Sequence, residues 1–240
     1  MLEKLKEEVF AAHMELSARG LVVFTWGNVS GIDRRSGLVA IKPSGVGYDD
    51  MKVSDIVLVD LNGRAVEGEM RPSADTPAHL ELYKGFPAVG AVVHTHSRWA
   101  MAFAQAGREI PPYGTPHADY FYGPIPCTRE ITDAEIRGEG DCEKTIGRLI
   151  VERFLGVRAK VDPIDVPAAL VRHVGPFAWG KDPREALRNA AVLEEIAMTA
   201  WHTQALSPAA TPMPRTLLDR HYLRRHGVDA YYGQNPGEEL

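Results

Sequence analysis

A run of apolar residues that ends in two histidines constrains this chain more than any other stretch of its sequence. Residues 89–93 are rich in valine, which is typical of a buried β-strand, and they lead directly into His94-Thr95-His96. Side chains in a strand alternate between its two faces, so His94 and His96 point in the same direction. The sequence therefore predicts a buried strand that presents two imidazole groups at its end.

Two imidazole groups on one face can bind a single metal ion, although a His-x-His pair is also found among ordinary core or surface histidines. Asp75, upstream in a turn bounded by Pro72 and Pro77, supplies a carboxylate. Nitrogen and carboxylate ligands together suit Zn²⁺ or a similar divalent ion. The pattern favours a metal site formed by Asp75, His94 and His96.

The composition excludes several classes of function. The chain has 240 residues, of which 45% are hydrophobic and 25% charged, as expected for one large soluble globular domain. The net charge of −5, with no basic block, argues against nucleic-acid binding, and no apolar run is long enough to cross a membrane. The mixed-charge N-terminus does not resemble a signal peptide, and Cys127 and Cys142 are expected to be reduced in a cytoplasmic protein.

Strand and helix patterns alternate along the chain, which favours one α/β domain with a mixed sheet and helices on its faces. Gly20 is expected to end the first helix, and Asn62-Gly63 is a hairpin signal. Helices are predicted at about residues 2–19, 76–85, 98–106, 142–155 and 183–205, with a short one within 214–232. Strands are predicted at 21–30, 38–42, 56–60, 89–94 and 168–174.

Three turns rich in glycine, serine or asparagine flank these elements. They contain Gly27 and Asn28, then Lys42, Ser44 and Gly45, and finally Ser73 and Ala74. Glycine lets backbone amides approach an anion, and Lys42 adds a positive charge. Each turn alone is more often only a turn, but together, beside a metal site, they favour a small phosphorylated substrate. The chain has no dinucleotide fingerprint and no P-loop.

Two further places could supply acid–base groups. Asp119 lies in the aromatic-rich segment 114–123, where apolar surroundings would raise its pKa, although a simple Asx turn is the alternative. Tyr231 and Tyr232 lie near the C-terminus and would reach a site only if the tail docks onto the protein.

Seven motifs together resemble the class II aldolase/epimerase family, and in particular its L-ribulose-5-phosphate 4-epimerase branch. They are TWGNVS (25–30), IKPSG (41–45), DTP (75–77), HTHSR (94–98), HADYFYG (117–123), GPFAWG (175–180) and HYLRRHG with YYGQ (221–234). The match extends over residues 1–234, with 235–240 as a tail. It implies a mostly antiparallel or mixed sheet with helices on both faces, and a homotetramer with active sites between subunits.

The resemblance also implies roles for individual residues. Asp75, His94 and His96 would bind zinc or another divalent metal. Asp119 and Tyr232, the latter from a neighbouring subunit, would be the acid–base groups, and His221 would support the tyrosine. The substrate, a phosphorylated ketopentose, would be surrounded by Gly27, Asn28, Lys42, Ser44, Gly45, Ser73 and Ala74.

The sequence departs from the family pattern at two positions. Ala74 replaces a serine, so one hydroxyl group to the phosphate is missing. The family's third zinc histidine, directly before Gly-Pro-Phe, is Val174 here, and the histidine is His173. A one-residue shift in a regular strand turns a side chain to the opposite face, so either a bulge re-aims His173 or the metal has fewer protein ligands. We expect the regular strand, because nothing in residues 168–174 signals a bulge.

The implied reaction inverts C4 of L-ribulose 5-phosphate, giving D-xylulose 5-phosphate. The C4 hydrogen is β to the C2 carbonyl and is not acidic, so inversion needs either transient oxidation or cleavage of the C3–C4 bond. Because the sequence has no nicotinamide fingerprint, retro-aldol cleavage is favoured. Two alternatives stay open: an aldolase acting on a related sugar phosphate, and a metal-poor, non-catalytic relative similar to adducin.

Overall fold

One antiparallel β-sheet forms the centre of the protein. The computed structural model describes residues 2–137, 141–156, 161–228 and 230–231. Within these ranges the sheet has seven strands in the order β4-β3-β2-β1-β5-β7-β6, with every neighbouring pair antiparallel. The strands are β1 (Asn28–Asp33), β2 (Leu38–Ile41), β3 (Val57–Asp60), β4 (Ala65–Glu67), β5 (Ala91–His94), β6 (Ala168–Val171) and β7 (Gly175–Gly180).

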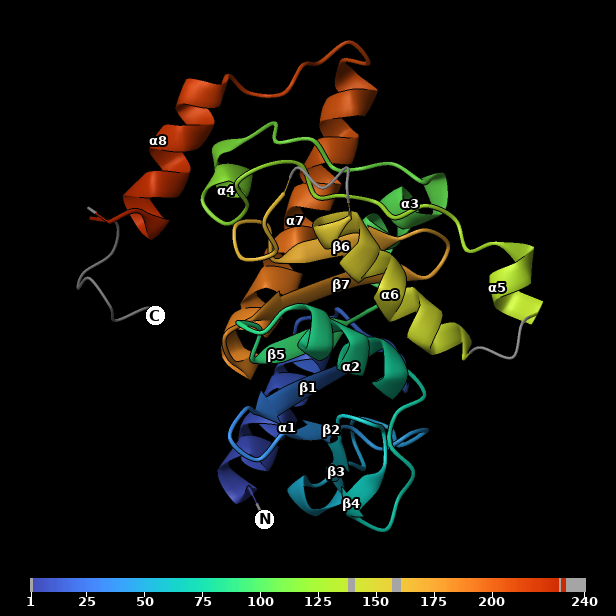
Figure 1. Ribbon diagram of the computed structural model, residues 1–240. Coiled ribbons are helices and arrows are strands. Elements are labelled where there is room, and N and C mark those ends of the chain that lie inside the picture. The colour runs from blue at the N-terminus through green and yellow to red at the C-terminus, as the bar shows by residue number, and fades with distance from the viewer. Residues whose placement is uncertain (1, 138–140, 157–160, 229, 232–240) are drawn as a thin grey trace.

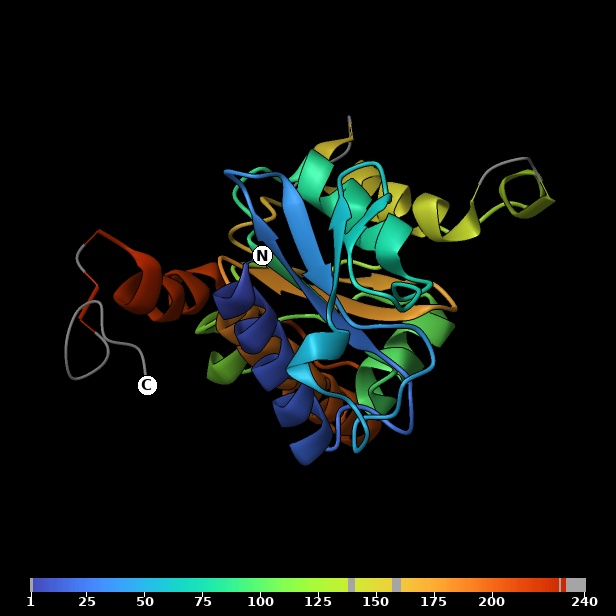
Figure 2. The ribbon, with the colours of Figure 1, turned by 90° about the horizontal axis from the view of Figure 1, so that it is seen from below.

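Helices cover both faces of this sheet. Helices α1, α3 and α7 lie on one face, and α2 and α6 lie on the other (Figures 1 and 2). The helices are α1 (Glu3–Ala18), α2 (Thr76–Gly85), α3 (Arg98–Ala106), α4 (Thr115–Ala118), α5 (Asp133–Arg137), α6 (Cys142–Leu155), α7 (Pro183–Leu206) and α8 (Arg215–His226), with a 3₁₀ turn at Val53–Asp55. The predicted fold class is therefore confirmed. In the part of the chain that the structure describes, no helix combines the length and apolar character needed to span a bilayer.

The end of α1 is fixed by the glycine that the sequence pattern indicated. Gly20 has a left-handed φ of 67°, and the N–H of Leu21 donates to the carbonyl of Leu16 at 3.1 Å. Leu16 and Leu21 are both buried, so this is a Schellman motif with its usual apolar contact. The motif directs the chain out of α1 toward the sheet.

Two predicted strands differ from the structure by more than two residues at one or both ends. The strand expected at 21–30 begins only at Asn28, because the chain turns through Phe24 (φ 55°) and Gly27 (φ 76°), and it continues through Gly31 to Asp33. The strand expected at 168–174 ends at Val171, and residues 172–174 form the turn into β7. In both segments the apolar residues favour a strand more strongly than the local sequence favours a turn, so the turns were not predicted.

The central strand β5 positions the metal candidates at its end. β5 lies between β1 and β7, with Asn28 and Phe177 flanking His94 in register. Its residues Ala91, Val92 and Val93 are almost completely buried, because helices cover both faces. The predicted buried strand leading to His94 is confirmed.

Helices α2 and α6 cross at a close contact that depends on Gly147. A Cβ atom at this position would lie 2.5 Å from the carbonyl oxygen and 2.9 Å from the Cα of Ala78 in α2. Both atoms belong to the backbone, so no side-chain rotation can make room. The crossing holds α2, which begins beside Asp75, against the sheet.

We therefore predict that Gly147→Ala destabilises the protein even though alanine favours a helix by about 1 kcal/mol. Overpacking against the α2 backbone should outweigh that gain and lower the free energy of unfolding by about 1–2 kcal/mol, which corresponds to roughly 2–8 °C in melting temperature. Calorimetry checks this. Gly47→Ala is the control, because its Cβ would make only an ordinary contact at 3.5 Å with Asp50. A Gly147→Ala protein as stable as the parent would contradict the close crossing.

Candidate active site

The His94 side chain is held in place by burial, a stacking contact and a hydrogen bond. It is the last residue of β5, only 2% exposed, and its ring stacks on Phe177 with a centroid distance of 4.2 Å. Its Nδ1 lies 3.0 Å from the carbonyl oxygen of Pro176. A carbonyl oxygen can only accept, so Nδ1 carries the proton and Nε2 keeps a free lone pair. Burial lowers the pKa of His94, which favours the neutral ring that a metal requires.

His96 completes a pair of convergent nitrogen atoms. The two Nε2 atoms of His94 and His96 are 3.1 Å apart. Two nitrogens that each lie about 2.0–2.1 Å from one tetrahedral zinc ion are roughly 3.3 Å apart, so the spacing suits a shared metal. His96 is exposed, and its ring lies 5.7 Å from that of Trp26, so this side of the pair is open to a substrate.

Asp75 lies beside this pair without yet converging on it. Its Oδ2 accepts a hydrogen bond of 2.6 Å from the side-chain amide of Asn28, which pairs with His94 across β1 and β5. The charge of Asp75 acts to raise the pKa of His94, so the two groups are within electrostatic range. Across the described ranges, no three histidine, cysteine or carboxylate side chains form a ready metal cluster. A metal ion bound by all three side chains would require Asp75 to turn toward the two imidazoles.

His173 faces a different environment. It has a left-handed φ of 65° in the β6–β7 turn, its side chain is 51% exposed, and its Nε2 lies 3.2 Å from Glu130. The expectation of a regular strand through Val174 is wrong, because β6 ends at Val171. Gly175, and not His173, borders the pair: a Cβ there would lie 3.4 Å from both the His94 and the His96 rings.

The turns predicted to surround a phosphate lie together. The N–H of Ser44 donates to Arg71 O, and the N–H of Ser73 donates to Lys42 O, both at 2.9 Å. Ser44, Gly45 and Ala74 are exposed. The amides of Gly45 and Ala74 donate to no other residue in the described part of the chain, so they remain available to an anion.

Asn28, Gly27 and Lys42 form the inner part of this region. The Asn28 amide donates to Ser73 Oγ at 3.0 Å as well as to Asp75. Gly27 fits because a Cβ there would lie 2.8 Å from the His94 carbonyl oxygen. Lys42 is buried, and its Nζ donates to Val46 O at 2.5 Å. Lys42 thus holds the turn in place from inside instead of reaching outward.

Asp119 lies at the end of α4, against α8. Arg224 binds both of its carboxylate oxygens at 2.9 Å, and His221 Nδ1 lies 3.2 Å from Oδ1. His226 contacts the Asp119 carbonyl oxygen at 2.9 Å. The aromatic surroundings that the sequence suggested for the carboxylate are replaced by basic side chains of α8. His221 thus contacts Asp119, whereas Tyr232, which it was expected to support, lies outside the described residues.

Sequence reasoning missed His79, which lies one helical turn after Asp75 in α2. It is fully buried, and its Nδ1 lies 2.7 Å from Ser30 Oγ. Burial lowers the pKa of His79 to about 3, so the ring is neutral. Its Nε2 and the Asn28 Oδ1 are buried atoms that have no hydrogen-bond partner among the described residues. The Asp-x-x-x-His spacing was the available signal, because residues four apart share a helix face.

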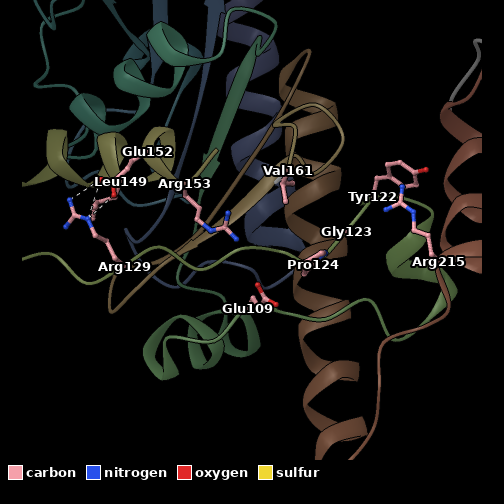
Figure 3. A pocket seen from close by; sticks show the side chains of 10 residues that line it. All are labelled: Glu109, Tyr122, Gly123, Pro124, Arg129, Leu149, Glu152, Arg153, Val161 and Arg215. Carbon is pink, nitrogen blue, oxygen red and sulfur yellow. Dashed lines mark hydrogen bonds and ion pairs between the residues drawn. The ribbon is translucent and has the colours of Figure 1, made fainter. Parts of the chain in front are cut away.

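A surface pocket of about 760 Å³ lies elsewhere on the protein (Figure 3). Its walls include Arg129, whose guanidinium is paired with Glu135 and Glu152, and Arg215, which is paired with Asp219. None of the residues that line it belongs to the site predicted from the sequence. The pocket does share the segment 114–123, through Tyr122 and Gly123, and helix α8, through Arg215, with the surroundings of Asp119.

Comparison with known proteins places this geometry in a family. Residues 7–201 match the family model described as the class II aldolase and adducin N-terminal domain. The chain is 52% identical to L-ribulose-5-phosphate 4-epimerase UlaF of Salmonella paratyphi B over 233 residues, covering 97% of this chain and 100% of the relative.

Solved structures show the same fold at lower identity. An L-fuculose 1-phosphate aldolase has a TM-score of 0.78 at 23% identity, covering 91% of this chain and 94% of the other. YgbL of Klebsiella pneumoniae, titled a putative aldolase/epimerase/decarboxylase, has a TM-score of 0.70 at 24% identity, covering 92% and 99%. With its family match across most of the sequence, its sheet topology and its paired histidines, this chain belongs to the class II aldolase and adducin family.

Proposed function

We propose that this protein is a divalent-metal-dependent L-ribulose-5-phosphate 4-epimerase that forms D-xylulose 5-phosphate, with Zn²⁺ as the metal. The proposed metal site is supported mainly by the two Nε2 atoms of His94 and His96, which lie 3.1 Å apart. The hydrogen bond to the Pro176 carbonyl oxygen keeps the His94 proton on Nδ1, so its Nε2 can bind a metal. The 52% identity to the UlaF epimerase supports the substrate.

The donor set fits a divalent ion. His94, His96 and Asp75 would hold it, with water or substrate completing the shell, because Val174 cannot ligate and His173 is bound to Glu130. Bound there, the ion would act as a Lewis acid toward the ketose oxygens. We infer that this chain uses fewer protein ligands than the family pattern.

The reaction we propose breaks and remakes the C3–C4 bond. A base takes the proton of the C4 hydroxyl, the C3–C4 electron pair moves toward C2, and the products are glycolaldehyde phosphate and the enediolate of dihydroxyacetone. The aldehyde then rotates and presents its other face, C3 attacks it, and an acid returns a proton to the C4 oxygen. Two acid–base groups on opposite sides of one carbon are required.

Asp119 and Tyr232 are the proposed acid–base pair. In the described structure Asp119 Oδ1 accepts from Arg224 and His221, whereas Oδ2 accepts from Arg224 alone. Oδ2 thus keeps a lone pair for a substrate proton. His221 would orient the carboxylate.

We propose a homotetramer in which each site is shared between subunits and Tyr232 comes from a neighbouring subunit. Asp119 contacts α8, whereas His94 and His96 contact β7 and the loop at Trp26. Helix α8 projects from the body of the protein (Figures 1 and 2). Tyr232 follows α8 in the chain, so we propose that it reaches the metal site of a partner subunit.

The phosphate is proposed to bind at the exposed turns. The available donors are the backbone amides of Gly45 and Ala74, the Ser44 hydroxyl and the turn at Gly27. Ala74 supplies its amide without the hydroxyl that serine would add. This site would hold the aldehyde fragment by its phosphate while the reacting carbon rotates.

Incubation of the purified protein with L-ribulose 5-phosphate should yield D-xylulose 5-phosphate in a zinc-dependent reaction. Removal of metal by a chelator should abolish turnover, and added zinc should restore it, because the enediolate charge is no longer stabilised without metal. Trapping should detect little free glycolaldehyde phosphate. Accumulation of that fragment would instead indicate an aldolase.

Zinc titration of variants should locate the ligands. His94→Asn should weaken zinc binding by at least about 100-fold, since losing a ligand costs more than losing a group that orients one. His173→Ala, which removes an exposed imidazole, should leave zinc affinity within about twofold of the parent. Val174→His should tighten it. Loss of zinc on His173→Ala would show that His173 is a ligand and would contradict the site described here.

Mixing two inactive variants should test the shared site. Asp119→Asn and Tyr232→Phe should each lower kcat by about 10²–10⁴-fold, because each lacks one acid–base group. Hybrid tetramers should regain part of the parental rate if the two residues meet between subunits. Verified hybrids with no recovered activity would argue that both groups come from one chain.

A further inference from the structure

We propose that His79 is a positioning residue that holds Asp75 in place for metal binding by donating a hydrogen bond from Nε2. The inference deepens the proposed function, since it assigns a role at the same metal site. His79 is 0% exposed and lies four residues after Asp75 in α2, whose first turn begins at Asp75. Side chains at this spacing share one face of a helix.

The proton on His79 can be assigned from its neighbours. The Ser30 hydroxyl oxygen lies 2.7 Å from His79 Nδ1 and 2.7 Å from the hydroxyl of Tyr83. Tyr83 is buried, and Ser30 Oγ is the hydrogen-bond partner that its hydroxyl has among the described residues, so we assign Tyr83 as the donor. The Ser30 proton then goes to Nδ1, which leaves the single N–H of the neutral ring on Nε2.

This N–H is an unused buried donor beside a carboxylate. In the described part of the chain, His79 Nε2 has no hydrogen-bond partner, and a buried donor that stays unpaired is destabilising. The His79 ring meets the Phe177 ring edge-on with 6.0 Å between centroids, and Phe177 also stacks on His94, so His79 borders the same group of side chains. Asn28 Oδ1, which also has no partner among the described residues, and the Asp75 carboxylate are both acceptors here, and the charged carboxylate is the stronger of the two.

The hydrogen bond would form when Asp75 turns toward the histidine pair. At present its Oδ2 is held by Asn28 at 2.6 Å. A carboxylate has about four lone-pair sites, so Asp75 can accept from Asn28 and His79 and still offer an oxygen to a metal. With valine at position 174, the site depends more strongly on Asp75 than a site with a third histidine would.

Replacing His79 by asparagine and by glutamine tests its two nitrogen atoms separately. Asparagine places a polar atom near the former Nδ1 and can keep the contact with Ser30, whereas glutamine reaches the former Nε2 position and keeps an N–H there. Zinc affinity of the purified metal-free protein is measured by competition with a chromophoric chelator. His117→Asn is the control, because it changes another buried histidine, one that bonds to Gly123.

We expect His79→Asn to weaken zinc binding by about 10–100-fold and His79→Gln to stay within about threefold of the parent. His117→Asn should lower the melting temperature of the metal-free protein without changing zinc affinity. Equal losses in His79→Asn and His79→Gln, or none in His79→Asn, would overturn the inference. A parent protein that binds no zinc would instead remove the proposed metal site, and this inference with it.

Discussion

The hydrogen bond between His94 Nδ1 and the carbonyl oxygen of Pro176 determines most of what the site can do. It joins the end of β5 to the start of β7 at 3.0 Å, and the Phe177 ring beside it stacks on the imidazole. Because Nδ1 keeps its proton and donates it in a hydrogen bond to the carbonyl oxygen, Nε2 is left with its lone pair aimed at His96. A ring fixed by both a hydrogen bond and a stacking contact loses little entropy when a metal binds.

The rest of the site is assembled by the neighbours of β5. On one side, β1 ends at Asn28, whose amide joins Ser73 and Asp75. The turns at Ser44 and Ser73 are bonded to one another, so the proposed phosphate donors and the carboxylate move as one unit. Helix α2 begins in this unit and is held to α6 by the close approach at Gly147. A substitution far from the metal could therefore misplace Asp75.

Local patterns in the sequence were sufficient for many elements. The bounds of α2, α3 and α6 are those predicted, because each has a strong periodicity and clear end signals such as Pro77 and Gly107. Strand ends were harder to predict. The turn at His173 and the late start of β1 depend on pairing with β5 and β7, which no local window contains.

The site residues likewise fall into those that the local sequence identifies and those that depend on long-range contacts. His94, His96 and the three turns carry recognisable motifs, so they could be identified from the sequence. The basic surroundings of Asp119 come from α8, roughly a hundred residues later, and the unpaired nitrogen of His79 is visible only once Ser30 and Tyr83 are placed against it. Residues that act through long-range contacts are hard to identify from the sequence next to them.

The most direct test of the account is an anomalous difference map, recorded at the zinc absorption edge, from crystals grown with zinc. The account predicts one peak about 2.0–2.1 Å from the Nε2 atoms of His94 and His96 and about 2.0–2.2 Å from an oxygen of Asp75. It predicts no peak at His173. A peak coordinated by His173, or zinc absent from the histidine pair in crystals of protein shown to bind it, would contradict the account.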